Sequence, residues 1–360
     1  MEINDNLTIL LVLKDRESYT HRLMGYLNKI SCPFKILIAD GGTEDIAVSL
    51  EKYNNIKYEY VKYPYDQTIK HFTSKMADVV DKITTPLCMV VDNDDFFIIE
   101  GIKHCIEFLR THPQYSTARG AMGAIQIHDK HLHFERNIYS IYIDPITGES
   151  AAERILDQSK HFHGNWHAVI RTNHLQATYK LIDLWCPSNF RFIEQLVGYL
   201  YVAWGNGCRT IETPNIPFPE GYYLHETSTQ RVELDGNALA SHFPPQDEWI
   251  HSDYWPEDFA KMTNAIAAAI CHIDGSNWND ARYHFKKAYL HKLPDLQELL
   301  GRRMDEYMSA SLPIENFHGD YAHAKATLDK IKPPNEIIEQ SIFPTAKSEW
   351  ESLRSHIGEC

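Results

Sequence analysis

Short apolar runs alternate with helical patterns through the first hundred residues, and this alternation most constrains the fold. The first and last runs are apolar and rich in β-forming residues, as expected of strands buried on both faces. Helical patterns lie between the runs, with Leu23, Tyr26 and Leu27 on one face of the first. Strands and helices that alternate at this spacing predict an α/β fold with a largely parallel sheet and helices on both faces. The four predicted strands are residues 7–13, 35–39, 56–61 and 87–91.

Acidic residues follow two of these strands directly. Asp40 ends the second predicted strand, and the run Asp92-Asn93-Asp94-Asp95 follows the fourth. In parallel sheets, ligands bind beyond the carboxyl ends of the strands. We therefore expect both acidic positions to open onto one crevice.

The acidic run is the strongest single indication of chemistry. It places three carboxylates within four residues, and they repel one another unless a cation or basic side chain compensates. Hard oxygen ligands of this kind suit Mg²⁺ or Mn²⁺, which can bridge them to a diphosphate. An acidic turn that caps a helix would explain one aspartate but not three. An EF-hand does not fit, because its glycine and distal glutamate are missing from the following positions.

The rest of the chain is less regular and ends in a region dominated by helix formers. Residues 115–235 mix strand-like segments with one helical stretch, and the texture changes after about residue 242. We expect an α/β domain over residues 1–240 and a helical C-terminal region over 241–360, which serves acceptor binding or oligomerisation. The strand-like segments are residues 124–133 and 161–171, and the helical ones are 193–204, 259–273, 278–291 and 296–309.

Charge and composition exclude several classes of protein. The formal net charge of −14 argues against a nucleic-acid binder, which needs a basic face to displace counterions. No apolar run approaches the roughly 18–20 residues that span a bilayer. The seven cysteines are scattered without a C-x-x-C pair, which suits a reducing compartment. We expect a soluble, cytoplasmic protein without a transmembrane segment.

Three segments together resemble the family 2 glycosyltransferases of the GT-A fold, a Rossmann-like α/β fold. They are TILLVLKDRESY at residues 8–19, ADGGTED at residues 39–45, and the acidic run. The resemblance implies a nucleotide-sugar donor, with the segment around Leu13 and Arg16 cradling the nucleobase. It also implies that Asp40 contacts base or ribose, that Lys75 meets the diphosphate, and that Asp92 and Asn93 bind the sugar donor. The divalent ion, Mn²⁺ or Mg²⁺, would be held by Asp92 and Asp94.

The resemblance also implies an inverting transfer with one general base that deprotonates the acceptor hydroxyl. The family places this base in a Glu-Asp motif at a helix start, where this chain has Glu194-Gln195. Aligning through the later Gly205 puts Glu194 at the family's Asp position, and aligning through Gly207 puts Gln195 there. Glu194 is the only carboxylate in either alignment, so it is the predicted base. Asp183 and Glu220 are the nearest alternatives in sequence.

Histidines at two places in the chain are candidates for metal ligands. The resemblance implies that His225, in a loop after the helix of the base, completes the metal shell. His161, His163 and His167 surround Gly164-Asn165-Trp166, and we interpret them as packing or acceptor contacts rather than a zinc site.

These features together predict a metal-dependent inverting glycosyltransferase of the hexosyltransferase type. The donor would be a nucleotide sugar, with a UDP-sugar as the first candidate. The acceptor would be a hydroxyl of a glycan or glycoconjugate. The C-terminal helices could form a homo-oligomer. One alternative is a catalytically silent nucleotide-sugar scaffold, favoured by Gln195. Another is a nucleotidyltransferase, which lacks support because no glycine-rich phosphate loop follows the first strand.

Overall fold

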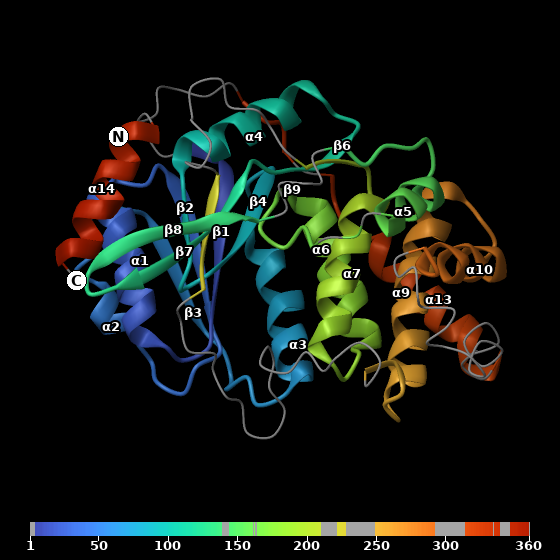
Figure 1. The fold of residues 1–360 in the computed structure, drawn as a ribbon. Coiled ribbons are helices and arrows are strands. Elements are labelled where there is room, and N and C mark those ends of the chain that lie inside the picture. Colours follow the sequence, from blue (N-terminus) through green and yellow to red (C-terminus); the bar gives the residue numbers. More distant parts are fainter. Residues whose placement is uncertain are drawn as a thin grey trace.

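The structure is a computed structural model of the chain. It describes residues 4–138, 144–160, 162, 164–209, 222–227, 249–291, 314–333, 335–338 and 346–359. The predicted fold class is confirmed, because a mostly parallel sheet lies between layers of helices and the C-terminal part is helical (Figure 1). None of the helices among these residues is long and apolar enough to cross a membrane.

The main sheet has seven strands, and its strand β1 pairs in parallel with β2 and β4. Strand β9 is the exception to the parallel arrangement, since it runs antiparallel to both β4 and β6. In spatial order the strands are β10 (Asn206–Cys208), β6 (Tyr115–Ala118), β9 (Val169–Arg171), β4 (Leu87–Asp92), β1 (Asn4–Leu13), β2 (Phe34–Asp40) and β3 (Tyr58–Lys62).

The register of the sheet brings the two acidic positions to the end of one strand. Leu13 at the end of β1 pairs with Asp40 on one side, and Val12 pairs with Asp92 on the other. The carboxyl ends of parallel strands meet at one edge of a sheet. Asp40 and Asp92 therefore flank the end of β1, as the sequence predicted.

A second, four-stranded sheet lies beside this edge. Its strand β5 directly follows the acidic run, and β11 joins β5 to the long hairpin of β7 and β8. The sequence predicted one strand-like segment over residues 124–133, whereas the chain turns back at Asp129 and Lys130 to form two strands. The strands are β5 (Phe96–Phe97), β11 (Tyr223–Glu226), β7 (Met122–His128) and β8 (His131–Ile138).

Helices cover both faces of the main sheet and form two cores. Leu10 of β1 faces the core built with α3, α6, α7 and α9, while Ile9 and Leu11 face the core built with α1 and α4. This is why the second half of β1, from Ile9 to Leu13, is apolar without a break. The helices outside the C-terminal region are α1 (Glu17–Lys29), α2 (Ala47–Leu50), α3 (Ile69–Val79) with the 3₁₀ turn η1 (Val80–Lys82), α4 (Ile99–Thr111), α5 (Ala151–Lys160), α6 (Thr172–Trp185) and α7 (Phe190–Ala203).

Three expected segments differ in detail. Of the strand expected over residues 161–171, β9 (Val169–Arg171) forms, whereas the described residues 164–168 are not in a strand. The helix expected over 193–204 begins earlier, at Phe190, because the side chain of Asn189 accepts a hydrogen bond from Arg191 N and caps it. The helix expected over residues 296–309 lies outside the described residues.

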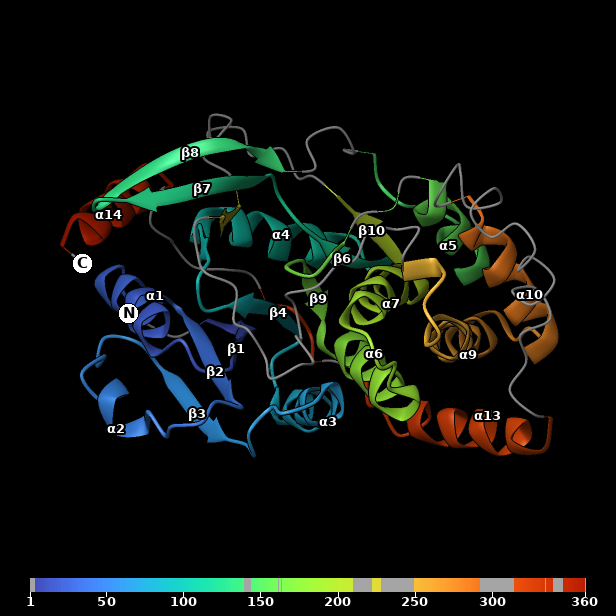
Figure 2. The same cartoon turned by 60° about the horizontal axis from the view of Figure 1, so that its bottom comes forward.

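The C-terminal helices divide between the two ends of the molecule (Figure 1). Helices α9 (Trp255–Asp274) and α10 (Trp278–Tyr289) pack with α5 and α7, and α13 (Ile314–Leu328) packs with α6 and α9. Helix α14 (Ala346–Glu359) instead packs on α1, α4 and β8 at the opposite end (Figure 2). The C-terminal region is therefore not one separate bundle.

Helix α14 also supplies the cap for the start of α4. The fully buried carboxylate of Glu349 accepts hydrogen bonds from the backbone N–H groups of Ile99 and Glu100. These groups are among the N-terminal donors that an α-helix leaves unsatisfied. Helix α4 begins four residues after Asp95, so the cap also supports the segment that follows the acidic run.

We expect Glu349→Ala to lower the free energy of unfolding by about 1–3 kcal/mol, because it leaves two buried N–H groups without an acceptor. Chemical denaturation monitored by circular dichroism would measure the change. Glu351→Ala is the matched control, since Glu351 is exposed on the same helix and should change stability by less than about 0.5 kcal/mol. Equal stability of the two variants would show that the cap contributes nothing.

Candidate functional site

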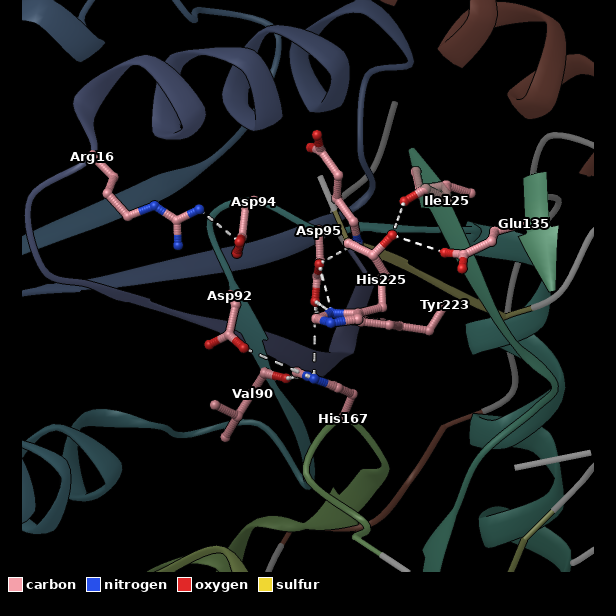
Figure 3. Close-up of polar contacts among 12 residues, drawn as sticks. Arg16, Val90, Asp92, Asp94, Asp95, Ile125, Glu135, His167, Tyr223 and His225 are labelled. Atoms are coloured by element: carbon pink, nitrogen blue, oxygen red, sulfur yellow. Dashed lines mark hydrogen bonds and ion pairs between the residues drawn. The ribbon is translucent and has the colours of Figure 1, made fainter. Parts of the chain in front are cut away.

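The acidic run forms the turn between β4 and β5, at the edge where the main sheet meets the second sheet. Asp92 is the last residue of β4, and Phe96 is the first residue of β5. The side chains of Asp92, Asp94 and Asp95 point in different directions from this turn (Figure 3). The three carboxylates therefore have different neighbours, and each can serve a different purpose.

One group of side chains in the described part of the chain is arranged to hold a metal ion. It consists of Asp92, Asp95 and His167, whose ligand atoms all lie within 4.8 Å of one another. The Nε2 atom of His167 is 3.9 Å from Asp92 Oδ2 and 4.0 Å from Asp95 Oδ2. Atoms that are each about 2 Å from one Mg²⁺ or Mn²⁺ lie about 3–4 Å from one another, so this spacing suits a shared ion.

The surroundings of His167 orient its imidazole ring and keep the ring neutral. Its Nδ1 lies 3.2 Å from the carbonyl oxygen of Val90, a contact that places the ring proton on Nδ1 and the lone pair on Nε2. Burial lowers the pKa of His167 to about 4, despite the opposing attraction of Asp95. The ring also stacks on Tyr223 at a centroid distance of 4.0 Å. A neutral, oriented imidazole of this kind is the form that binds metals.

Asp95 is the anchor of the group. Its fully buried carboxylate accepts hydrogen bonds from Tyr223 Oη at 2.7 Å and from the backbone N–H of Glu226 at 2.9 Å. The Nδ1 of His225 lies 3.1 Å from it. Burial alone would raise the pKa of Asp95, but these hydrogen bonds and the nearby histidines hold it below its usual value. Asp95 therefore stays ionised and ties β11 to the acidic turn.

Asp92 is the most accessible member, with 45% of its side chain exposed. Desolvation and repulsion from Asp95 and Asp94 raise the pKa of Asp92 to about 8. The hydrogen bond from His225 to Asp95 raises the pKa of His225 to about 9, so this imidazole is positively charged and offsets part of the repulsion. The accumulated negative charge is what a divalent cation would relieve, and the donor set fits such an ion.

Asp94, the second metal ligand expected from the sequence, lies outside this group of three. Its carboxylate forms an ion pair with Arg16, at 2.7 Å between Nη2 and Oδ2. Asn93 holds the same loop from the other side, donating from Nδ2 to Arg16 O at 3.3 Å and to Thr20 Oγ1 at 3.0 Å. The structure thus brings Arg16, Asn93 and Asp94 together next to the cluster. Metal ligation by Asp94 and by His225 stays a prediction.

Asp40 lies across the end of β1 from this cluster. Its carboxylate accepts hydrogen bonds from Gly42 N at 2.7 Å and Tyr60 Oη at 2.5 Å, and Lys62 lies 3.2 Å away. The turn after Asp40 requires glycine at Gly41, because a Cβ atom there would lie 2.3 Å from the Asp66 carboxylate. Asp40 is thereby fixed at the crevice edge.

Lys75 and Leu13 lie next to the turn that follows Asp40. The buried ammonium of Lys75 forms an ion pair with Asp66 and donates to Leu13 O at 3.0 Å. Leu13 is buried and its carbonyl also accepts from Gly41 N at 2.9 Å. In this arrangement the charge of Lys75 is already balanced, so contact with a diphosphate stays a prediction.

The predicted base, Glu194, lies near the start of α7. Phe190 at the start of α7 packs on Trp166, the neighbour of His167. Glu194 is partly buried on this helix, whereas Gln195 is buried and accepts a 2.7 Å hydrogen bond from Tyr289 Oη. The side chain of Gln195 thus contacts the C-terminal helices. Glu194 is the carboxylate of the pair and stays the predicted base.

The two alternative bases differ in what the structure shows of them. Asp183 lies in the last turn of α6, the helix before α7, and binds Lys70, Thr73 and Ser74 of α3. These contacts give it a packing role between α6 and α3. Glu220 lies outside the described residues, as do His161 and His163.

The sequence did not indicate that His167 lies beside Asp92 and Asp95, or that Asp95 has contacts of its own. His167 was interpreted as a packing or acceptor contact, yet it belongs to the possible metal group. Its position just before β9, which pairs with β4 through Cys88 and Ile170, brings it to the acidic turn. Antiparallel insertion of β9 leaves no local signal, and no residue near His167 in sequence reveals the partner strand.

Comparison with solved structures shows likeness to S. aureus TarS over the whole chain. TarS 1–349 in complex with UDP-GlcNAc is 14% identical, with 100% of this chain and 91% of that chain covered and a TM-score of 0.51. TarS 1–349 is also 14% identical (100% and 90%, TM-score 0.48), and a further TarS structure is 13% identical (100% and 55%, TM-score 0.49). No family model and no curated protein matches the chain. At this identity the likeness establishes the fold.

Proposed function

We propose that this chain is a metal-dependent glycosyltransferase that transfers a sugar, with inversion, from a nucleotide sugar to a hydroxyl acceptor. The observation that carries the proposal is the group of Asp92, Asp95 and His167 at the carboxyl end of β4. Ligands of such sheets bind at this edge, and a diphosphate needs a cation to approach three carboxylates. The whole-length likeness to TarS in complex with UDP-GlcNAc supports a UDP-sugar as the first candidate.

The side chains divide into three proposed roles. Asp92, Asp95 and His167 would hold the divalent ion, with Asp94 and His225 close enough to adjust the charge around it. Such an ion stabilises the charge that develops on the leaving nucleoside diphosphate. Asp40 and Arg16, on either side of the end of β1, would bind the nucleoside and phosphate. Glu194 would take the proton from the acceptor hydroxyl.

The nature of the ligands favours Mn²⁺ over Mg²⁺. Carboxylates suit both ions, while an imidazole nitrogen favours a transition metal. We keep a glycan or glycoconjugate as the proposed acceptor and the cytoplasm as the proposed location. A homo-oligomer through the C-terminal helices also stays a proposal.

Thermal unfolding with nucleotides tests the proposal directly. We expect UDP and UDP-GlcNAc to stabilise the protein in Mn²⁺ but not in EDTA, by about 2.7 kcal/mol at a hundred times the dissociation constant. UMP is the matched control, because it lacks the second phosphate that a bound ion would bridge. Stabilisation by UDP that persists in EDTA would contradict metal dependence. No stabilisation by any nucleoside diphosphate or nucleotide sugar would contradict the proposed function.

A nucleotide-sugar binder without transferase activity is the second candidate, and Gln195 favours it. Residue 195 is an amide where the resembled family often has the catalytic carboxylate, and it is turned toward Tyr289. Slow release of UDP from UDP-GlcNAc distinguishes the two candidates. A transferase leaks metal-dependent hydrolysis, whereas a binder forms the complex and releases none.

A further inference from the structure

The loop between β1 and α1 is strained and held in place on both sides. Asp15 and Arg16 have φ values of 56° and 62°, in the left-handed region that non-glycine residues seldom adopt. Asp15 Oδ1 accepts a 2.7 Å hydrogen bond from Thr43 N, and Arg16 O accepts one from Asn93. The loop is thus fixed between the turn after β2 and the acidic run, and the direction of the Arg16 side chain is fixed with it.

The guanidinium of Arg16 has one satisfied side and one unused donor. Its Nη2 donates to Asp94 Oδ2 at 2.7 Å, and its face lies 4.4 Å from the ring centroid of Tyr19. Its Nε is buried and has no hydrogen-bond partner among the described residues. A buried donor of this kind is costly unless a ligand satisfies it. Because a guanidinium offers donors in a planar fork, a phosphate group suits the unused side.

We propose that Arg16 is shared between Asp94 and the phosphates of the sugar donor, and thereby couples nucleotide binding to metal binding. This inference rests on the proposed function and deepens it. Without a nucleotide, Arg16 neutralises Asp94 beside the cluster of Asp92, Asp95 and His167. Phosphates that engage Arg16 weaken its pairing with Asp94. The negative charge of Asp94 then acts on the cluster, which binds a divalent cation more tightly.

The proposed coupling predicts that replacing Arg16 changes Mn²⁺ affinity and UDP affinity in opposite directions. A purely structural role of Arg16 would not produce this result. Removing the guanidinium should take away the positive charge that pairs with the Asp94 carboxylate, with or without nucleotide. The variant should therefore bind Mn²⁺ alone more tightly than the wild type, while it binds UDP more weakly. Since coupling between two ligands is reciprocal, the effect of UDP on Mn²⁺ affinity should shrink by the same factor as the effect of Mn²⁺ on UDP affinity.

Arg16→Gly is the variant of choice, because glycine adopts the left-handed conformation of residue 16 without strain. We expect its affinity for Mn²⁺ alone to rise about 5- to 10-fold and its affinity for UDP in Mn²⁺ to fall at least about tenfold, within the range usual for coupled sites. Electron paramagnetic resonance of free Mn²⁺ and calorimetric UDP titration measure the two affinities. Arg16→Lys keeps the charge without the fork, so its Mn²⁺ affinity should stay within about twofold of wild type while UDP binds more weakly.

Lys14→Ala is the control for a general loss of positive charge. Lys14 lies two residues away, and its ammonium donates to Asp66 O at 2.6 Å. It should leave Mn²⁺ affinity within about twofold, because its charge lies off the cluster. Unchanged or weaker Mn²⁺ binding in Arg16→Gly, with wild type binding both ligands, would overturn the coupling and leave the proposed function standing. A wild type that binds neither Mn²⁺ nor UDP would overturn the proposed function itself.

Discussion

Asp92→Asn should reduce Mn²⁺ affinity at least about 100-fold and abolish metal-dependent binding of UDP. Loss of an outer-shell partner of a metal site costs about 10–100-fold in affinity, so loss of a direct ligand should cost no less. Asparagine keeps the shape of the side chain and removes the charge. Because the Asp92 side chain is nearly half exposed, the change should leave the fold intact. Electron paramagnetic resonance of free Mn²⁺, with calorimetric titration of UDP, gives both affinities.

Asp129→Asn is the matched control. It makes the same chemical change at an exposed turn of the β7–β8 hairpin, where φ is 48° and asparagine is well tolerated. We expect wild-type affinities and stability for that variant. Wild-type Mn²⁺ affinity in a folded Asp92→Asn would remove Asp92 from the site. His167→Ala would then show whether an ion binds the remaining pair of Asp95 and His167.

The sequence predicted the half of the fold whose signals are local. Strands β1, β2 and β4 contain apolar runs followed by polar turns, and their parallel pairing follows from the helices between them. Strand β9 was obscured because it is three residues long and pairs antiparallel with residues some eighty positions earlier. Helix α14 was obscured for a similar reason. Its apolar side chains Trp350, Leu353 and Ile357 predict a helix with a buried face, but nothing local shows that this face packs near α1.

The site was predictable where it depends on consecutive residues and not where it depends on tertiary contacts. The acidic run and Asp40 follow strands directly, so their meeting at one edge could be inferred from the sequence. The different partners of the three aspartates within the run could not be inferred from the sequence. Asp94 pairs with Arg16 and Asp95 with His225 because the strained loop after β1 and strand β11 reach the turn from distant parts of the chain. The sequence holds twenty histidines, and the contact of His167 with Val90 O is a tertiary one that no local pattern among them reveals.

Glu194→Gln should lower the rate of sugar transfer by about 10²–10⁴, the usual contribution of a positioned general base. This equals about 3–5 kcal/mol of transition-state stabilisation at 1.36 kcal/mol per tenfold. Glutamine keeps the shape and hydrogen-bonding reach of the side chain but accepts no proton. UDP affinity should change by less than about twofold, because Asp40, Arg16 and the metal group lie on other elements. Radiolabelled transfer to acceptor and calorimetric UDP titration separate the two effects.

The structure adds a reason for choosing Glu194 over its neighbour. Gln195 is 3% exposed and holds Tyr289, so Gln195→Glu would bury a carboxylate beside the C-terminal helices rather than restore a base. Glu257→Gln is the matched control for the Glu194 variant, since Glu257 is an exposed residue in the first turn of α9 that pairs with Lys261. A folded Glu194→Gln that transfers sugar within about threefold of wild type, like the control, would assign the proton transfer to another group. A variant that loses transfer and UDP binding together would instead place Glu194 in the sugar-donor site, because a base acts only on the acceptor.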